Sequence, residues 1–252
     1  SDVCLVIVRK PRIGFNGPMI LRILSLWLAC SFSIMAQISE SRAGDGPNAH
    51  AWEMFQLFRQ MTQGNFCFSP FSGHRLVSML AEGARGATQR QLLNMAHLSA
   101  NQDKRAKDAE TIRQALASSA ASHGILLEVA NSIWVPPQAM LEPDYGSWIG
   151  KHYGAMIQTL PGSDAVGSAK KVNQWIREKT RGRIIDLVGP NQFQQPGMAL
   201  LLVNSVYLKS AWAKRFDPKA TKPRVFTKAN GAQSMLPLMA QTNAFLFADA
   251  PT

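Results

Sequence analysis

The sequence predicts an α+β fold in which helices overlie an open β-sheet. Helical patterns come first along the chain and strand patterns dominate its end, an order that favours α+β over an alternating βαβ arrangement. The most informative segment is Ala199–Trp212, a near-continuous apolar strand interrupted by the amide of Asn204. A buried amide is costly unless it is hydrogen-bonded. Since Asn65–Ser72 also sets small polar side chains beside a hydrophobic strand, we expect a polar cluster under the sheet.

The first helices are predicted from apolar residues at helical spacing. Ala49–Met61 carries one such stripe, and Phe66–Phe68 follows it as a short strand. Ser72–Leu98 is predicted as two helical pieces, because Gly86 breaks the run and Thr88 is placed to cap the second piece.

The middle of the chain contains three predicted helices and one strand. Asn101–Ser122 is polar at its start and alanine-rich later, which suits an exposed surface helix. Ile125–Val135 is an apolar strand that two prolines end abruptly. Further helices are predicted at Pro143–His152 and Asp164–Arg181.

The sequence pattern near the end of the chain predicts a hairpin. The sequence as a whole is typical of one domain. Thr221–Phe247 is predicted as short strands around the turn Ala229–Gly231. The sequence has no internal repeat, no low-complexity tract and no interdomain linker. We therefore expect a leader over residues 1–43 and one domain over residues 44–252.

The leader has the anatomy of a signal peptide that begins at Met19. Arg22 supplies a basic start, Ile23–Met35 an apolar stretch, and small or polar residues surround Ala36 and Ala43. The apolar run is short for a spanning helix. We therefore expect a secreted, extracellular protein with no membrane span in its mature form; an uncleaved anchor and a buried N-terminal helix are the alternatives. Residues 1–18 carry no readable fold.

Cysteine usage predicts no disulfide within the mature chain. Cys4 and Cys30 lie in or before the leader, which leaves only Cys67. We interpret Cys67 as an apolar residue buried in a strand rather than as a nucleophile or metal ligand.

The composition is globular, 46% hydrophobic and 17% charged, with a formal net charge of +11. Such a charge can attract an acidic polysaccharide, nucleic acid or an anionic membrane, but it identifies none of them. Between Lys170 and Lys228, thirteen basic residues stand against three acidic ones. This excess makes a glycosaminoglycan or other polyanion a candidate partner, with Lys170, Lys171 and Arg177 as contacts, and it predicts no specific nucleic-acid site. The stretch mixes helix, strand and loop, and need not form one face.

The sequence offers no catalytic or cofactor motif. It contains no glycine-rich phosphate loop, no zinc-protease helix motif and no nucleophile elbow. Glu142 and Asp144 flank a proline, as expected for the start of a helix rather than for an acid pair. The histidines are scattered without metal-ligand spacing, so we expect them at surface or capping positions. They are His50, His74, His97, His123 and His152. We expect no metal, no cofactor and no enzymatic activity.

Five blocks in the correct order, from about Ala49 to the end, resemble the serpin superfamily. The first two are similar to its Phe-Ser-Pro-x-Ser block and its Gly-Ala-x-Gly-x-Thr turn. The third is similar to the helix and turn that cross the front of the main sheet. The fourth, with Trp212 and Phe216, is similar to the third strand of that sheet, and the last to the strand after the hairpin. The blocks are Asn65–Ser72, Gly83–Thr88, Val172–Ile184, Leu202–Lys209 and Leu236–Met239.

The resemblance implies a large central sheet with a second, smaller sheet, and inhibition of a serine or cysteine endopeptidase. A target protease would cut a reactive loop, which then inserts into the sheet as an extra strand. By resemblance, Ser69, Ser72 and Asn204 form the polar cluster where strands part, and Trp212 caps the strand where insertion begins.

The helix beneath which the loop passes would be secured by Asn173, Trp175 and Thr180. Ordinary core and capping roles are the alternative for these residues and for the polar cluster.

Two departures from the family pattern matter. Ser210 stands where the family usually has Gly, and the chain stops at Thr252, before the expected later strands and reactive loop. The sequence is therefore interpreted as the N-terminal part of an inhibitory serpin. A non-inhibitory relative acting as carrier, chaperone or storage protein, and a polyanion-binding module, are the alternatives. The target protease, the scissile residues and the oligomeric state are not predicted.

Overall fold

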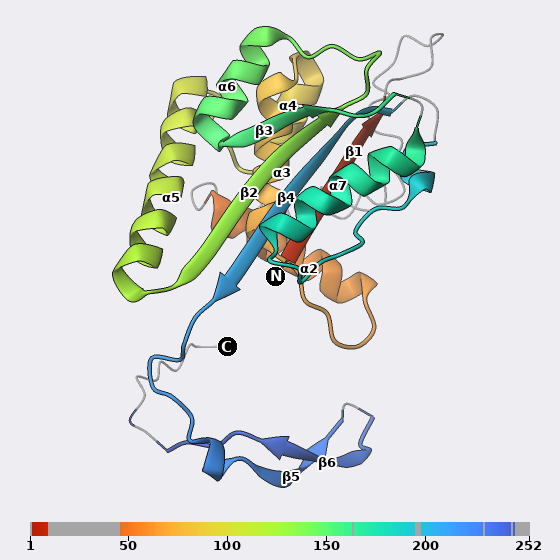
Figure 1. Ribbon diagram of the computed structural model, residues 1–252. Helices are drawn as coiled ribbons and strands as arrows, with labels where there is room; N and C mark the ends of the chain where they lie inside the picture. The colour runs from red at the N-terminus through yellow and green to blue at the C-terminus, as the bar shows by residue number, and fades with distance from the viewer. Residues whose placement is uncertain are drawn as a thin grey trace. The chain divides into compact units, whose positions relative to one another are not determined.

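The computed structural model describes residues 2–9, 46–162, 164–194, 198–228, 230–242 and 244 (Figure 1). The chain divides into two compact units, Ser1–Lys209 and Ser210–Thr252. The predicted signal peptide, from Met19 to Ala43, lies outside the described residues.

The first unit contains a four-stranded sheet in the order β1-β4-β2-β3. The long central strand β4 (Met198–Lys209) pairs antiparallel with β2 (Leu126–Val135) on one side and with β1 (Asp2–Arg9) on the other. The short strand β3 (Ala155–Thr159) pairs parallel with β2. The apolar strand predicted around Leu200 is therefore at the centre of the sheet, and it places Asn204 directly opposite Asn131 of β2.

The described chain contains six helices. The helices are α2 (Pro47–Met61), α3 (Pro70–Gly83), α4 (Gly86–Met95), α5 (Gln102–His123), α6 (Pro143–Tyr153) and α7 (Ala165–Lys179). Of these, α3, α5, α6 and α7 contact strands of this sheet, while α2 and α4 pack against α3. Three begin at a proline, which suits the first helical turn because its amide needs no partner there. Side chains also cap some of the helices: Ser69 accepts a hydrogen bond from the amide of Ser72, and Asp164 accepts one from Gly167.

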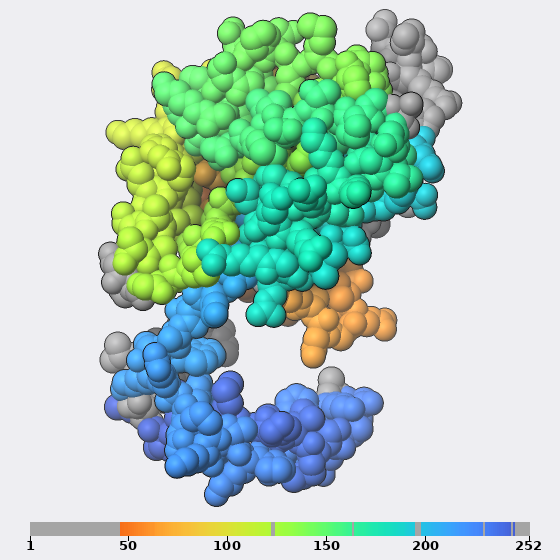
Figure 2. Space-filling model, in the orientation of Figure 1, coloured from red at the N-terminus to blue at the C-terminus, as the bar shows by residue number. Residues whose placement is uncertain are grey.

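Helices lie on both faces of the sheet (Figure 1). Each face carries its own apolar core. On one face, α3 and α6 bury Leu76 and Ile149 against Ile133 and Leu202 of the sheet. On the other face, α7 packs its apolar stripe against β2 and β4; the buried residues there include Trp134, Val172, Ile176, Leu201 and Val203. Figure 2 shows the atoms of α7, in teal, covering part of this second face. The α+β architecture with helices over a large sheet is confirmed.

Two strands were not predicted. β3 follows α6 after a single residue, Gly154, whose φ of 63° makes the reversal into the strand easy for glycine. β1 lies in the segment from which the sequence predicted no fold, and it pairs with a strand almost 200 residues away in the chain.

Three local predictions were wrong. Cys67 is exposed, and Phe66–Phe68 is not a strand, because no strand of the described chain pairs with it. The second helix of the pair begins at Gly86 rather than after Thr88, and its N-cap residue, Arg85, makes no side-chain capping bond.

The second unit is built on the predicted hairpin. Strand β5 (Lys222–Thr227) pairs antiparallel with β6 (Gln233–Leu238). In the turn, the amide of Gly231 donates to the carbonyl of Lys228 over 2.9 Å. A short 3-10 turn, η3 (Pro218–Ala220), precedes the hairpin, and another, η2 (Pro190–Gln192), precedes β4 in the first unit.

Candidate functional site

A buried amide pair connects the two central strands. Asn204 is fully buried in β4, and its Nδ2 donates to Oδ1 of Asn131 over 2.7 Å. Nδ2 of Asn131 in turn donates to the carbonyl of Tyr153, at the end of α6, over 2.8 Å. The first of these hydrogen bonds joins β4 to β2, and the second joins β2 to the end of α6. Oδ1 of Asn204 has no hydrogen-bond partner among the described residues.

The two serines of the predicted polar cluster bond to each other. Oγ of Ser72 donates to Oγ of Ser69 over 2.9 Å, at the start of α3. Ser72 is fully buried, and α3 packs against β4. In the described chain neither serine is hydrogen-bonded to Asn204, whose partner is Asn131. The opening of the sheet at these residues stays a prediction.

The predicted anchors of α7 hold the segment that follows the helix. Oδ1 of Asn173 accepts from the amides of Leu187 and Val188, both over 3.0 Å, and its Nδ2 donates to the Val188 carbonyl. Thr180, fully buried, donates from Oγ1 to the Ile176 carbonyl at the end of α7.

The hydroxyl of Thr180 also accepts a hydrogen bond from the amide of Ile184, over 3.0 Å. Trp175 is buried edge-on against Trp134 of β2, with ring centroids 6.2 Å apart. These contacts fasten α7 to the sheet and to the following loop. A role of the helix in loop insertion stays a prediction.

The remaining predicted residues lie at the surface. Trp212 belongs to the second unit, is 65% exposed, and packs edge-on against Phe216 at 5.5 Å. Lys170, Lys171 and Arg177 are exposed on α7, and Nζ of Lys171 donates to the Thr159 carbonyl. Of the thirteen basic residues between Lys170 and Lys228, seven belong to the first unit and six to the second.

Two histidines are buried rather than at the surface, and both take the capping role that was the other expectation. His50 and His74 are buried, with their ring centroids 5.5 Å apart. Nδ1 of His50 is 2.8 Å from the Met95 carbonyl and Nε2 of His74 is 3.1 Å from the Ala96 carbonyl, so both fasten the end of α4. Burial lowers the pKa of His74 to about 4, and electrostatic repulsion from the neighbouring His50 contributes to the decrease.

A buried ion pair joins α3 and α5, and it was not predicted from the sequence. Nε of Arg105 on α5 lies 2.8 Å from Oε1 of Glu82 on α3, and both side chains are inaccessible. The hydroxyl of Tyr153 donates to the same carboxylate over 3.1 Å. The available signal was Glu82 itself, an acidic residue on the helix face that also carries Met79. Burial raises the pKa of Tyr153, and the Glu82 charge raises it further.

Neither a metal cluster nor a spanning helix is found in the part of the chain that the structure describes. No group of three or more His, Cys, Asp or Glu residues there is arranged to hold a metal ion. None of its helices combines the length and apolar character that crossing a membrane requires.

A family model described as serpin (serine protease inhibitor) matches residues 45–252. The chain belongs to the serpin family. Glia-derived nexin of Rattus norvegicus is 28% identical over 190 residues, 75% of this chain and 47% of the relative. Leukocyte elastase inhibitor of Xenopus tropicalis is 30% identical over 205 residues, 77% of this chain and 52% of the relative.

The fold agrees with solved serpin structures. The crystal structure of native protease nexin-1 with heparin is 25% identical, with a TM-score of 0.66 over 78% of this chain and 52% of that one. This serpin chain therefore spans about half the length of the curated relatives it matches.

Proposed function

We propose that the full-length serpin containing this chain inhibits a serine or cysteine endopeptidase by reactive-loop insertion, and is not itself an enzyme. Family membership supports the proposal, as do relatives named as an elastase inhibitor and a serine protease inhibitor. Loop insertion requires the edge of a central strand to accept an extra strand.

The observation that carries the proposal is the pairing of β1 along the edge of β4 that faces away from β2. The backbone of β4 pairs antiparallel with eight consecutive residues, Asp2–Arg9, opposite Met198–Val206. Since backbone pairing does not depend on sequence, an edge that accepts this segment can accept another extended segment in the same direction. Signal-peptide cleavage in the Met19–Ala43 region would separate Asp2–Arg9 from the domain and leave the edge open.

The residues of the predicted polar cluster fit this proposal because they lie on or beside the strand that would gain a new neighbour. Asn204 bonds across to β2 while Ser69 and Ser72 lie at the start of the helix packed behind β4. We propose that these three residues adjust when the sheet opens, and that Asn173 and Thr180 keep α7 attached while it does. For Trp212 we propose the role of marking the end of β4 at which insertion begins.

The test is incubation of the full-length protein with a panel of serine and cysteine endopeptidases. We expect at least one to form a covalent complex that survives denaturing electrophoresis, because the trapped species is an acyl-enzyme. A protease whose catalytic serine is replaced by alanine should form none and serves as the control. Cleavage by every protease without a stable complex, and without a rise in thermal stability after cleavage, would favour the non-inhibitory alternative.

Secretion is part of the proposal and has its own test. Expression in a secreting host, followed by N-terminal sequencing of the protein in the medium, should place the first residue between Ala36 and Asp45. Retention inside the cell with an intact leader would contradict it.

We propose polyanion binding as a second function. The supporting observations are the exposed basic residues of α7 and the serpin structure that contains heparin. Reversing Lys170, Lys171 and Arg177 to Glu should lower the salt concentration at which the protein leaves a heparin column. The matched control reverses three exposed basic residues on other helices, Arg90, Lys107 and Lys151. Equal effects from both triple variants would show that net charge alone is responsible.

A further inference from the structure

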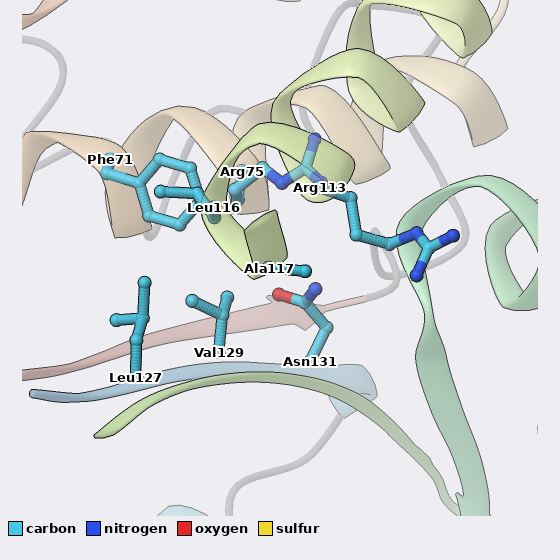
Figure 3. A pocket seen from close by; sticks show the side chains of 8 residues that line it. All are labelled: Phe71, Arg75, Arg113, Leu116, Ala117, Leu127, Val129 and Asn131. Atoms are coloured by element: carbon cyan, nitrogen blue, oxygen red, sulfur yellow. The ribbon is translucent and has the colours of Figure 1, made fainter. Parts of the chain in front are cut away.

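A small pocket of about 120 Å³ lies between α3, α5 and β2 (Figure 3). Most of the side chains around it are apolar, including Phe71 from α3, Leu116 from α5, and Leu127 and Val129 from β2. Asn131 also lines the pocket, but its side-chain oxygen and nitrogen already bond to Asn204 and to the Tyr153 carbonyl.

The exceptional residue of the pocket is Arg75. It is 4% exposed, and its guanidinium lies 5.1 Å from the ring centroid of Tyr153 and 5.7 Å from that of Phe71. Its hydrogen bond to a protein acceptor is long, 3.4 Å from Nη2 to the Ala109 carbonyl. Nε has no partner, and Arg75 makes no ion pair with any described residue.

The neighbouring charges do not neutralise Arg75. Arg113 lines the same pocket but uses Nε and Nη2 to hold Glu110, at 2.8 and 2.6 Å. Glu82 is similarly committed to Arg105. A buried charge without a counter-charge is unfavourable, and burial accordingly lowers the pKa of Arg75. Aromatic rings compensate such a cation only in part.

We propose that this pocket binds a short-chain monocarboxylate, with the carboxylate on the Arg75 guanidinium and the hydrocarbon tail between α5 and β2. The planar guanidinium offers parallel N–H donors that match a carboxylate. Leu116, Leu127 and Val129 would cover the tail. A cavity of about 150 Å³ in a protein core holds benzene, so this volume suits a tail of about five carbon atoms.

The experiment measures binding of sodium hexanoate and of hexanamide by calorimetry, with sodium chloride added to equal ionic strength. Hexanamide keeps the tail and the carbonyl but lacks the charge. We expect hexanoate to bind with a dissociation constant on the order of 1 mM or below and hexanamide to bind about tenfold more weakly or worse. Decanoate should gain little, because its tail exceeds the pocket.

Three variants separate the pocket from general charge effects. Arg75→Met removes the cation and should weaken hexanoate binding at least about tenfold. Ala117→Trp fills the pocket from an exposed position on α5 and should have the same effect with Arg75 intact. Arg90→Gln, an exposed change on α4 outside the pocket, should leave binding unchanged.

Three results would overturn the proposal. Equal affinity for hexanoate and hexanamide would mean that Arg75 does not select a charge. Unchanged hexanoate binding in Ala117→Trp would place the ligand elsewhere. Absence of hexanoate binding to the folded, unmodified protein at tens of millimolar would mean that water alone solvates the guanidinium.

Discussion

Replacing Glu82 with glutamine should destabilise the first unit severely. The Glu82 carboxylate receives two hydrogen bonds from Arg105, Nε to Oε1 at 2.8 Å and Nη2 to Oε2 at 3.0 Å. It also accepts from Tyr153 and from Nε2 of Gln102. The substituted amide side chain would be almost the same size but would leave the Arg105 charge buried without a counter-charge.

The expected cost is about 3 to 5 kcal/mol, the usual effect of removing one member of a buried ion pair. A domain of ordinary stability has about 5 to 15 kcal/mol in total, so about a fifth of it or more would be lost. Urea unfolding followed by tryptophan fluorescence measures this free energy, with the m-value checked for constancy. Tyr153→Phe, which removes one hydrogen bond to a charged group, should cost only about 1.5 to 3 kcal/mol.

The double variant Glu82→Met, Arg105→Met tests the physical reason. It removes both charges, so it should be more stable than Glu82→Gln alone, although the carbonyls of Ser99 and Ala100 lose the donors that Arg105 gives them. A loss below about 1 kcal/mol in Glu82→Gln would refute the reasoning. So would a double variant at least as unstable as the single one.

Three further predictions concern polar side chains that form hydrogen bonds inside the first unit. The pKa of His74 is about 4 in the folded protein and 6.5 in the reference state, so this residue contributes stability above pH 6.5 that is lost as the pH falls toward 4. The shift in pKa corresponds to about 3 kcal/mol. In His74→Gln, the free energy of unfolding should therefore depend less steeply on pH in that window. An unchanged slope would contradict this. Asn173→Ala should lower the free energy of unfolding in urea by about 1 to 3 kcal/mol. The control Gln174→Ala, at the exposed neighbouring position, should lower it by less than about 0.5 kcal/mol. Equal losses in the two variants would mean that the Asn173 hydrogen bonds do not stabilise the fold. Asn204→Ala should cost about 1 to 3 kcal/mol in the same assay because Oδ1 of Asn131 loses its donor, and a neutral result would show that water replaces it.

Local sequence patterns predicted most of the fold. Most of the helices from Pro47 to Lys179 and the strand β4 were predicted from an apolar period or run of their own, with proline or glycine near an end, whereas α5 was predicted from its polar start and alanine-rich continuation. The turn around Asn230 was predicted from turn chemistry alone. Strand β3 was missed because five residues give too short a pattern, and its place is decided by pairing with β2.

The candidate site was less predictable, since it depends on which distant residues meet. Asn204 was predicted to be buried and hydrogen-bonded, but its partner Asn131 is 73 residues away, and nothing in the strand pattern singled that residue out. His74 and Arg75 were missed for the same reason. Arginine is usually found at the surface and histidine is only intermediate in burial, so it is the packing of α3 against its neighbours that makes both buried.

Tyr153 connects the buried polar groups on the α3 side of the sheet. Its hydroxyl donates to Glu82, its carbonyl accepts from Asn131, and its ring lies under the Arg75 guanidinium. One residue at the end of α6 therefore touches the ion pair, the amide bridge to β4 and the cation of the pocket. Because contacting groups couple energetically, their separate contributions cannot be added, and each must be measured against a variant of its own partner. The ring contact also explains how Arg75 stays buried without a carboxylate: the aromatic face stabilises the cation in part and leaves Nε available for an anion.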